Sequence, residues 1–186
     1  EAVELFMKQL NARIIENKKI ADRFYKMRLK SAYLAKNSKP GQFIEVRCSD
    51  GPEPLLRRPL GVHRIAKSGV ELLYEVVGKG TEILSRKSEG DMLDVIGPLG
   101  NGFEVTSTVH GSQPTVLVAG GIGVAPLVAL AEKIAYSVQR IAYREKQKIQ
   151  VMLGAKTKAC ILCEQEFKKI GCEVDVATED GSIGHK

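Results

Sequence analysis

A glycine-rich turn at residues 119–126 has the composition best suited to binding a phosphate group. It reads Ala-Gly-Gly-Ile-Gly-Val-Ala-Pro and lies between an apolar run at residues 115–119 and a helical pattern at residues 124–140. Glycines let the backbone turn sharply and let a diphosphate approach without interference from Cβ atoms, and the amides at a helix start favour negative charge. A turn kept for close packing is the alternative. The residues predicted to bind a nucleotide are Gly120, Gly121, Ile122, Gly123 and Pro126.

A second segment, Val-Gly-Lys-Gly-Thr at residues 77–81, also joins a predicted strand to a short predicted helix. It lacks the spacing of a phosphate-binding P-loop, which argues against a nucleotide triphosphatase. The amides of Gly80 and Thr81 at the helix start could still hold a diphosphate. An ordinary turn fits these residues equally well.

A third segment, Leu-Leu-Arg-Arg-Pro-Leu-Gly at residues 55–61, places an arginine directly before a proline. Arg58, fixed by Pro59 inside a strand, could hold a phosphate or the edge of a flavin, because a guanidinium offers several donors in a rigid plane. An exposed pair of arginines on an edge strand is the alternative.

Two kinds of element are expected to position these segments. Short alternating strands separated by Gly and Pro fill the first hundred residues, with one helix at residues 81–87, which predicts an antiparallel barrel or sandwich. Beyond a polar link at residues 110–114, apolar strands alternate with helices, which predicts a parallel sheet. The expected strands are residues 24–30, 43–48, 70–77, 91–96, 115–119, 149–153 and 173–177, and the later helices are 124–140 and 158–170. The strand at 91–96 should end at Gly97-Pro98. We expect domains at residues 7–110 and 111–186.

Taken in order, these motifs resemble the ferredoxin-NADP reductase superfamily, and within it the electron transfer subunits of the dihydroorotate dehydrogenase B type. The resemblance runs from Asn11 to Lys186. The stretches that carry it are Leu-Leu-Arg-Arg-Pro-Leu, Val-Gly-Lys-Gly-Thr-Glu-Ile-Leu, Ile-Gly-Pro-Leu-Gly-Asn-Gly-Phe and Ala-Gly-Gly-Ile-Gly-Val-Ala-Pro-Leu. It implies an N-terminal antiparallel Greek-key β-barrel that binds FAD, followed by a parallel-sheet α/β domain that binds NAD.

The resemblance also implies roles for individual residues. The residues that it places on FAD are Arg58, Pro59, Leu60, Gly61, Leu73, Tyr74, Glu75, Gly80 and Thr81. The first four would lie along the flavin and the diphosphate, the next three near the flavin or its ribityl chain, and the last two on the diphosphate. The turn at 120–123 would receive the nicotinamide nucleotide, and hydride would move between nicotinamide C4 and flavin N5. Because the flavin carries that chemistry, no catalytic side chain is expected.

The same resemblance implies a hetero-oligomer in pyrimidine biosynthesis. Electrons from an FMN-containing dihydroorotate dehydrogenase catalytic subunit would pass through a two-iron two-sulfur centre to FAD and then to NAD. The family carries a C-terminal cysteine cluster for that centre, which we expect to lie beyond this sequence. The cysteines present are Cys48, Cys160, Cys163 and Cys172. They are not spaced to supply its four ligands, and no metal site is predicted.

Two departures bear on function. Many relatives have Ser where this chain has Gly61, so only backbone is left there to hydrogen-bond the flavin N5. No acidic residue follows the strand at 149–153 to take a ribose hydroxyl, while Lys156 and Lys158 could accept a 2′-phosphate. NAD is favoured over NADP by the resemblance alone.

Composition excludes several other classes. The net charge is +6 over 186 residues, but the Lys and Arg residues are scattered and aromatic residues make up only 5%, which argues against a nucleic-acid binder. The uncharged stretch at 116–131 is too short and too glycine-rich to span a membrane. Sparse cysteines and the lack of a signal peptide predict a cytoplasmic protein. Two alternatives remain: a subunit of another flavin complex, of the ferredoxin-NADP reductase or sulfite reductase type, and a non-catalytic nucleotide-binding docking module.

Overall fold

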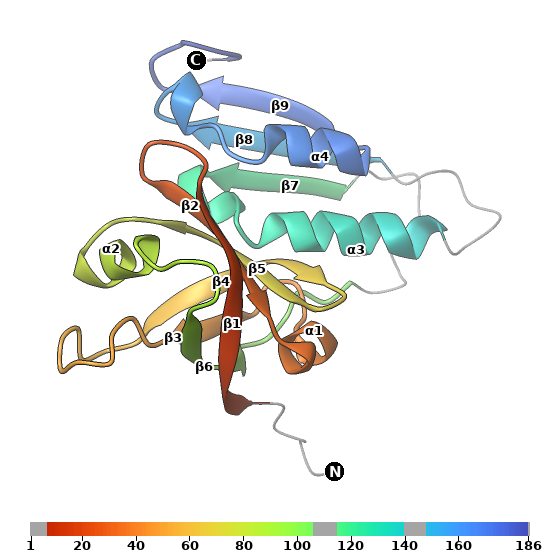
Figure 1. Cartoon of the computed structure of the whole chain (residues 1–186). Coiled ribbons are helices and arrows are strands. Elements are labelled where there is room, and N and C mark those ends of the chain that lie inside the picture. The colour runs from red at the N-terminus through yellow and green to blue at the C-terminus, as the bar shows by residue number, and fades with distance from the viewer. Residues whose placement is uncertain (1–6, 106–114, 140–147, 186) are drawn as a thin grey trace. The chain divides into compact units, whose positions relative to one another are not determined.

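The computed structural model describes residues 7–105, 115–139 and 148–185. The chain divides into two compact units, Glu1–Gly102 and Phe103–Lys186 (Figure 1). The domain boundary expected near residue 110 lies outside the described residues.

The first unit is a closed antiparallel barrel, as the resemblance implies, and it has six strands. The strands are β1 (Lys8–Lys19), β2 (Phe24–Lys30), β3 (Phe43–Val46), β4 (Arg58–Ala66), β5 (Gly69–Glu75) and β6 (Met92–Leu99). Their order around the barrel is β1-β2-β5-β4-β3-β6, and β6 pairs with β1 to close it. The connections from β2 to β3 and from β5 to β6 skip neighbouring strands, which makes the barrel a Greek key.

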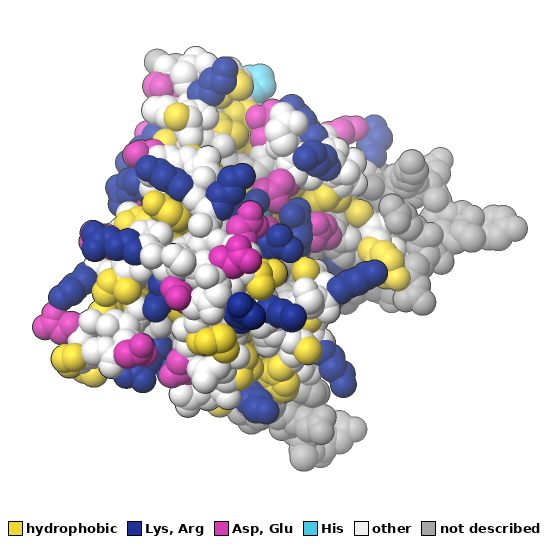
Figure 2. Space-filling view, viewed as in Figure 1, with side chains coloured by type: hydrophobic (Ala, Val, Ile, Leu, Met, Phe, Trp, Pro, Cys, Tyr) yellow, Lys and Arg dark blue, Asp and Glu magenta, His cyan; other side chains and the backbone are white. Residues whose placement is uncertain are grey.

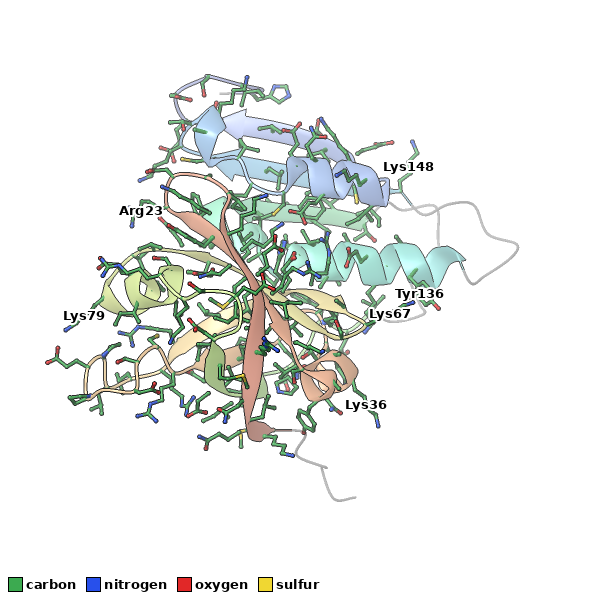
Figure 3. All side chains as sticks on the ribbon, in the orientation of Figure 1. Arg23, Lys36, Lys67, Lys79, Tyr136 and Lys148 are labelled. Atoms are coloured by element: carbon green, nitrogen blue, oxygen red, sulfur yellow. The ribbon has the colours of Figure 1, made fainter. Side chains whose placement is uncertain are left out.

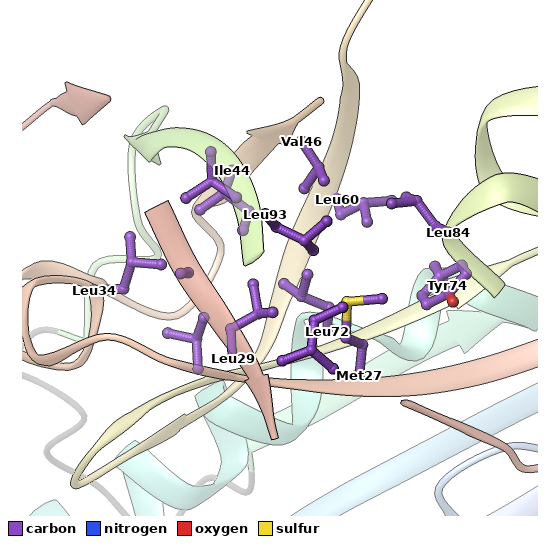
Figure 4. Packing of buried hydrophobic residues seen from close by; sticks show 14 of the residues in the cluster. Met27, Leu29, Leu34, Ile44, Val46, Leu60, Leu72, Tyr74, Leu84 and Leu93 are labelled. Carbon is purple, nitrogen blue, oxygen red and sulfur yellow. The ribbon is translucent and has the colours of Figure 1, made fainter. Parts of the chain in front are cut away.

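Alternate side chains of these strands fill the barrel (Figure 4). Met27 and Leu29 on β2 face inward together with Leu72 and Tyr74 on β5, and all four are buried. Removing a side chain of this size from water contributes about 1.5–3 kcal/mol each. The inward-facing residues of β4, Leu60 and Val62, belong to the same core. The opposite faces of β4 and β5 are therefore the ones on which a ligand can bind.

Four elements of this unit depart from expectation. β1 and the short helix α1 (Ala32–Asn37) were not predicted, although Ser31 Oγ caps α1 by accepting the Leu34 amide at 3.2 Å. β6 does not end at Gly97-Pro98. A register shift against β3 takes up one extra residue on β6, which lets the strand pass Pro98 although it lacks an N–H donor. The predicted helix at 81–87 is α2 (Lys79–Ser85) and begins two residues earlier.

The second unit contains the predicted parallel sheet, with strand order β7-β8-β9. Its elements are β7 (Thr115–Gly120), a 3-10 turn η1 (Gly121–Val124), α3 (Leu127–Gln139), β8 (Ile149–Ala155), a 3-10 turn η2 (Lys158–Cys160), α4 (Glu164–Ile170) and β9 (Glu173–Thr178). One face of β7 is buried through Leu117 and Ala119. The other face is not, and Val118 is 69% exposed, so the apolar run is only half-buried among the described residues.

Both helices of this unit are shorter than predicted. The helix predicted at 124–140 is α3, which starts directly after Pro126, while Val124 is the last residue of η1. The pattern at 158–170 divides into η2 and α4, because Cys163 adopts a left-handed backbone with φ 63° that a continuous helix does not allow. Cys160 and Cys163 therefore do not share a helix.

Charges of both signs are interspersed over the surface shown in Figure 2, in agreement with the scattered Lys and Arg of the sequence. No helix among the described residues is long and apolar enough to cross a membrane.

Candidate nucleotide-binding site

Arg58 at the start of β4 and Gly80 in the first turn of α2 lie in direct contact. A Cβ atom built on Gly80 would lie 2.7 Å from Arg58 Nε and 3.2 Å from both Cγ and Cζ. The arginine side chain therefore packs against the Gly80 backbone, in space that any larger residue would occupy. The second and third motifs thus lie side by side, a proximity that the resemblance implies and that no local sequence pattern reveals.

Hydrogen bonds to the preceding backbone fix the direction of the Arg58 guanidinium. Its Nη1 donates to Leu56 O at 2.8 Å and to Arg57 O at 3.2 Å. A guanidinium carries five N–H donors, so these two bonds orient it without exhausting its capacity to bind an anion.

Arg57, by contrast, is a structural residue. Its Nη1 donates to Asp94 O at 2.8 Å and its Nη2 to Asp94 Oδ2 at 2.6 Å. Burial opposes ionisation of Asp94, but hydrogen bonds from Arg57 and Gln9 hold the pKa of this carboxyl below its usual value. This clamp attaches the segment before β4 to β6.

The start of α2 offers backbone amides beside Arg58. Thr81 Oγ1 accepts the amides of Val77 at 3.0 Å and Gly78 at 3.3 Å, and it donates to Gly78 O. The hydroxyl therefore shapes the turn, and Thr81 can offer a ligand its backbone amide. The first helical bond runs from Glu82 N to Gly78 O, so the amides of the three residues before Glu82 precede the ladder and suit an anion.

Lys79 extends outward from this turn (Figure 3). It forms an exposed ion pair with Glu53, which holds the pKa of that carboxyl below its usual value. The loop before β4 is thus joined to α2 at the edge of the site. The segments that lead into β4 and α2 also carry strongly exposed apolar side chains, at Leu55, Leu56 and Val77.

The outer face of β4 next to Arg58 is open. Leu60 is buried inside the barrel, while Pro59 on the opposite face is exposed. A Cβ on Gly61 would meet no atom within 4 Å. A planar, largely apolar ring fits against such a surface.

The β5 residues expected near the flavin face two directions. Tyr74 points into the barrel, where its ring stacks on Tyr25 with centroids 5.8 Å apart and its hydroxyl donates to Asn17 Oδ1 at 3.0 Å. Leu73 and Glu75 alternate with it on the outer face, and Glu75 lies 3.6 Å from Arg23 Nε. Tyr74 can reach an outside ligand only through its backbone. Sequence reasoning missed Asn17, because β1 itself was not predicted.

The glycine turn of the second unit lies at the carboxyl end of β7, where open parallel sheets bind ligands. Gly121 has φ 52°, a left-handed value that favours glycine. A Cβ on Gly120, Gly121 or Gly123 would meet no atom within 4 Å. These glycines therefore leave open space, and the alternative of close packing is not supported. Ile122 lies within η1, and Pro126 directly precedes α3.

The loops after the neighbouring strands are joined beside this turn. Gly120 pairs with Gly154 on β8. The Lys158 amide donates to Ser182 Oγ at 2.8 Å, and the Ser182 amide donates to Asp180 Oδ1. The carboxyl ends of all three strands thus form one edge of the unit.

The four cysteines do not fit an iron-sulfur cluster. All are free thiols; Cys48 is buried in the barrel and Cys172 in the second unit. Burial raises the pKa of both thiols. Only Cys160 and Cys163 are partly exposed, which is fewer than the four ligands that a cluster needs.

Comparisons with known proteins agree with this geometry. Residues 117–175 match the model of the oxidoreductase NAD-binding domain. The chain is 41% identical over 181 residues to the dihydroorotate dehydrogenase B (NAD(+)) electron transfer subunit of Desulforamulus reducens, covering 96% of this chain and 65% of that protein. It is 35% identical to the subunit of the same name from Bacillus pumilus, covering 97% of this chain and 67% of that protein.

A solved structure of an NADH-dependent reduced ferredoxin-NADP oxidoreductase is 33% identical, with a TM-score of 0.74 over 94% of this chain and 59% of that one. The match to these curated relatives covers nearly all of this chain. The chain spans only about two thirds of their length. It belongs to the family of dihydroorotate dehydrogenase B (NAD(+)) electron transfer subunits, within the ferredoxin-NADP reductase superfamily.

Proposed function

We propose that this chain binds FAD on its barrel and NAD on its α/β unit, and carries electrons between NAD and a partner protein. The observation that carries the proposal is the contact between Arg58 and Gly80. It combines a fixed guanidinium and the free amides of a helix start, which together suit a diphosphate.

The described residues fit FAD in the following way. Arg58 and the amides of Gly80 and Thr81 would bind the diphosphate, while the open outer face at Pro59 and Gly61 would hold the flavin ring. Leu60 supports that strand from inside the barrel. The backbone of residues 73–75 would run beside the flavin or its ribityl chain. Bound FAD supplies both hydride and single-electron chemistry, and the protein supplies position and electrostatics.

The glycine turn would receive the nicotinamide nucleotide. The carboxyl end of β7 carries the residues Gly120, Gly121, Ile122 and Gly123. Pro126 directly precedes α3, the helix that follows this turn. The names of the relatives support NAD. Lys156 and Lys158 are exposed after β8, so comparing NADH with NADPH as reductants tests the choice of coenzyme.

The family name supports a dihydroorotate dehydrogenase catalytic subunit as the partner, and we propose that this partner contains FMN and forms a hetero-oligomer with the chain. The 33% identical solved structure favours a second candidate, a subunit of a ferredoxin-NADP oxidoreductase. Reduction of the flavoprotein by dihydroorotate with the first partner, or by reduced ferredoxin with the second, distinguishes the two.

Flavin binding tests the proposal on the isolated chain. Titration with FAD should shift the visible flavin spectrum and quench its fluorescence, and Arg58→Ala should weaken binding about ten- to hundredfold, as expected for loss of a charge-assisted hydrogen bond. The neighbouring substitution Lys79→Ala, which removes only an exposed ion pair, is the matched control and should change affinity little. A chain that takes up no FAD would favour the docking-module alternative.

A further inference from the structure

We propose that Asn17 is a positioning residue for the FAD diphosphate, acting through α2 from inside the barrel. The inference rests on the proposed function. It assigns to Asn17 and Tyr74 a task that neither the motifs nor the family name describes.

The side-chain amide of Asn17 is fully hydrogen-bonded. Its Nδ2 donates to Leu84 O at 2.9 Å and to Lys87 O at 2.8 Å, and its Oδ1 accepts the Tyr74 hydroxyl at 3.0 Å. An amide nitrogen has two hydrogens to donate, and both are used. These three partners also determine which way round the amide lies, since only its nitrogen can face two carbonyls.

Leu84 O lies in the last turn of α2, and Lys87 O lies two residues beyond the end of the helix. The last carbonyls of a helix have no partner within its regular ladder; Leu84 O accepts the Lys87 amide at 3.1 Å, and the Asn17 side chain on β1 adds a second donor to it. Leu84 is fully buried beside them in the barrel core. Asn17 and Leu84 therefore hold this end of α2 against the barrel.

The other end of α2 carries Gly80 and the diphosphate amides. A helix of seven residues is about 10 Å long, so a displacement at one end is transmitted to the other. Because Gly80 lies in close contact with Arg58, a shift of α2 would separate the amides from the guanidinium.

Tyr74 keeps the Asn17 amide in place. Burial raises the pKa of the Tyr74 phenol, so it stays protonated and donates its hydrogen to Oδ1. Figure 4 shows the ring among the barrel side chains near Leu84. A residue that the family pattern places near the flavin thus contributes its side chain from the opposite side of the strand.

The experiment replaces Asn17 by an isosteric acid and measures two quantities. Asn17→Asp turns an acceptor oxygen toward the two carbonyls, and Asn101→Asp at an exposed position is the charge-matched control. Amide hydrogen exchange of the FAD-free chain reports whether α2 alone is loosened while the barrel strands stay protected. Asn17→Ala serves as the second variant should Asn17→Asp not fold.

The second quantity is FAD affinity in a double-mutant cycle with Arg58→Lys. Lysine keeps the charge but lacks the guanidinium plane that packs on Gly80. We expect Asn17→Asp to raise the Kd for FAD about tenfold or more in the wild-type background and about twofold or less in the Arg58→Lys background, together with faster exchange of the α2 amides.

An equal loss of affinity in both backgrounds, or unchanged exchange of α2, would overturn the inference, because a general loss of stability does not depend on residue 58. Failure of the wild-type chain to bind FAD would overturn the proposed function and this inference with it. The wild-type titration alone therefore separates the two failures.

Discussion

Replacing Gly80 by alanine introduces one methyl group at the point where α2 meets Arg58. That carbon would lie 2.7 Å from Arg58 Nε and 3.2 Å from Cγ and Cζ, so the arginine must move. Its movement would break the bonds to Leu56 O and Arg57 O. Forcing a side chain aside typically costs about 1–3 kcal/mol, while alanine is favoured over glycine within a helix by about 1 kcal/mol.

The displacement of Arg58 and the higher helix propensity of alanine affect two measurable quantities, stability and FAD affinity, to different extents. The free energy of unfolding without FAD should change by no more than about 1–2 kcal/mol, because the helix gain offsets much of the strain. The affinity for FAD should fall about ten- to hundredfold, because the displaced guanidinium no longer faces the diphosphate. Urea unfolding and flavin fluorescence titration measure the two quantities.

Gly78→Ala is the matched control in the same turn. A Cβ at Gly78 would meet nothing within 4 Å, and the residue has an extended backbone with φ 179°. FAD affinity should therefore stay within about twofold of the wild type, as expected for a change that disturbs no contact. Equal loss of affinity in the two variants would refute the reasoning, because the contact with Arg58 would then not matter.

Three further predictions follow from the described contacts. Thr81→Val removes three hydrogen bonds at the start of α2 and should lower the free energy of unfolding by about 1–3 kcal/mol. Thr81→Ser keeps the hydroxyl and should retain most of the wild-type stability. Equal urea midpoints for Thr81→Val and the wild type would contradict this. Gly121→Ala forces φ 52° on an L-residue and should raise KM for NADH while leaving FAD binding unchanged; a parallel loss of FAD would place the turn elsewhere. The folded-state pKa of Asp94 lies below its usual 3.8, so its ionised form stabilises the fold above that pH and this stabilisation is lost as the pH falls through the folded pKa. Asp94→Asn should therefore reduce the loss of unfolding free energy at acid pH, measured by urea unfolding. An unchanged pH dependence would contradict the role of the clamp.

Much of the fold could be predicted because the strands keep a regular alternation. The pattern at residues 70–77 placed Leu72 and Tyr74 on one face, and both are buried in the barrel. Strand β1 keeps this alternation only from Leu10 to Ile14, because a register shift between Ile14 and Glu16 then changes which side chains face inward. The short alternating stretch was not recognised as a strand, and Asn17, which lies beyond the shift, was missed with it.

The helices show a different limit. A helical spacing predicted one helix at 158–170, but periodicity does not detect a single left-handed residue such as Cys163. The helix α1 has only six residues, too few to establish a period.

The individual site motifs could be recognised from local patterns, but only the family resemblance brought them together on one ligand. Glycine turns and an Arg-Pro pair are visible as local sequence patterns. The contact between Arg58 and Gly80 depends on how β4 and α2 lie in the folded barrel, which no local pattern specifies. For the same reason, the clamp between Arg57 and Asp94 distinguishes a structural arginine from a binding one only in three dimensions.

Anaerobic addition of NADH to the FAD-loaded chain tests the central claim most directly, because it requires both nucleotides to bind productively. The account predicts prompt bleaching of the visible flavin absorbance, as expected when a bound flavin is reduced, with Gly121→Ala slowing it at low NADH. A flavin spectrum that persists under excess NADH would contradict electron transfer between the two sites.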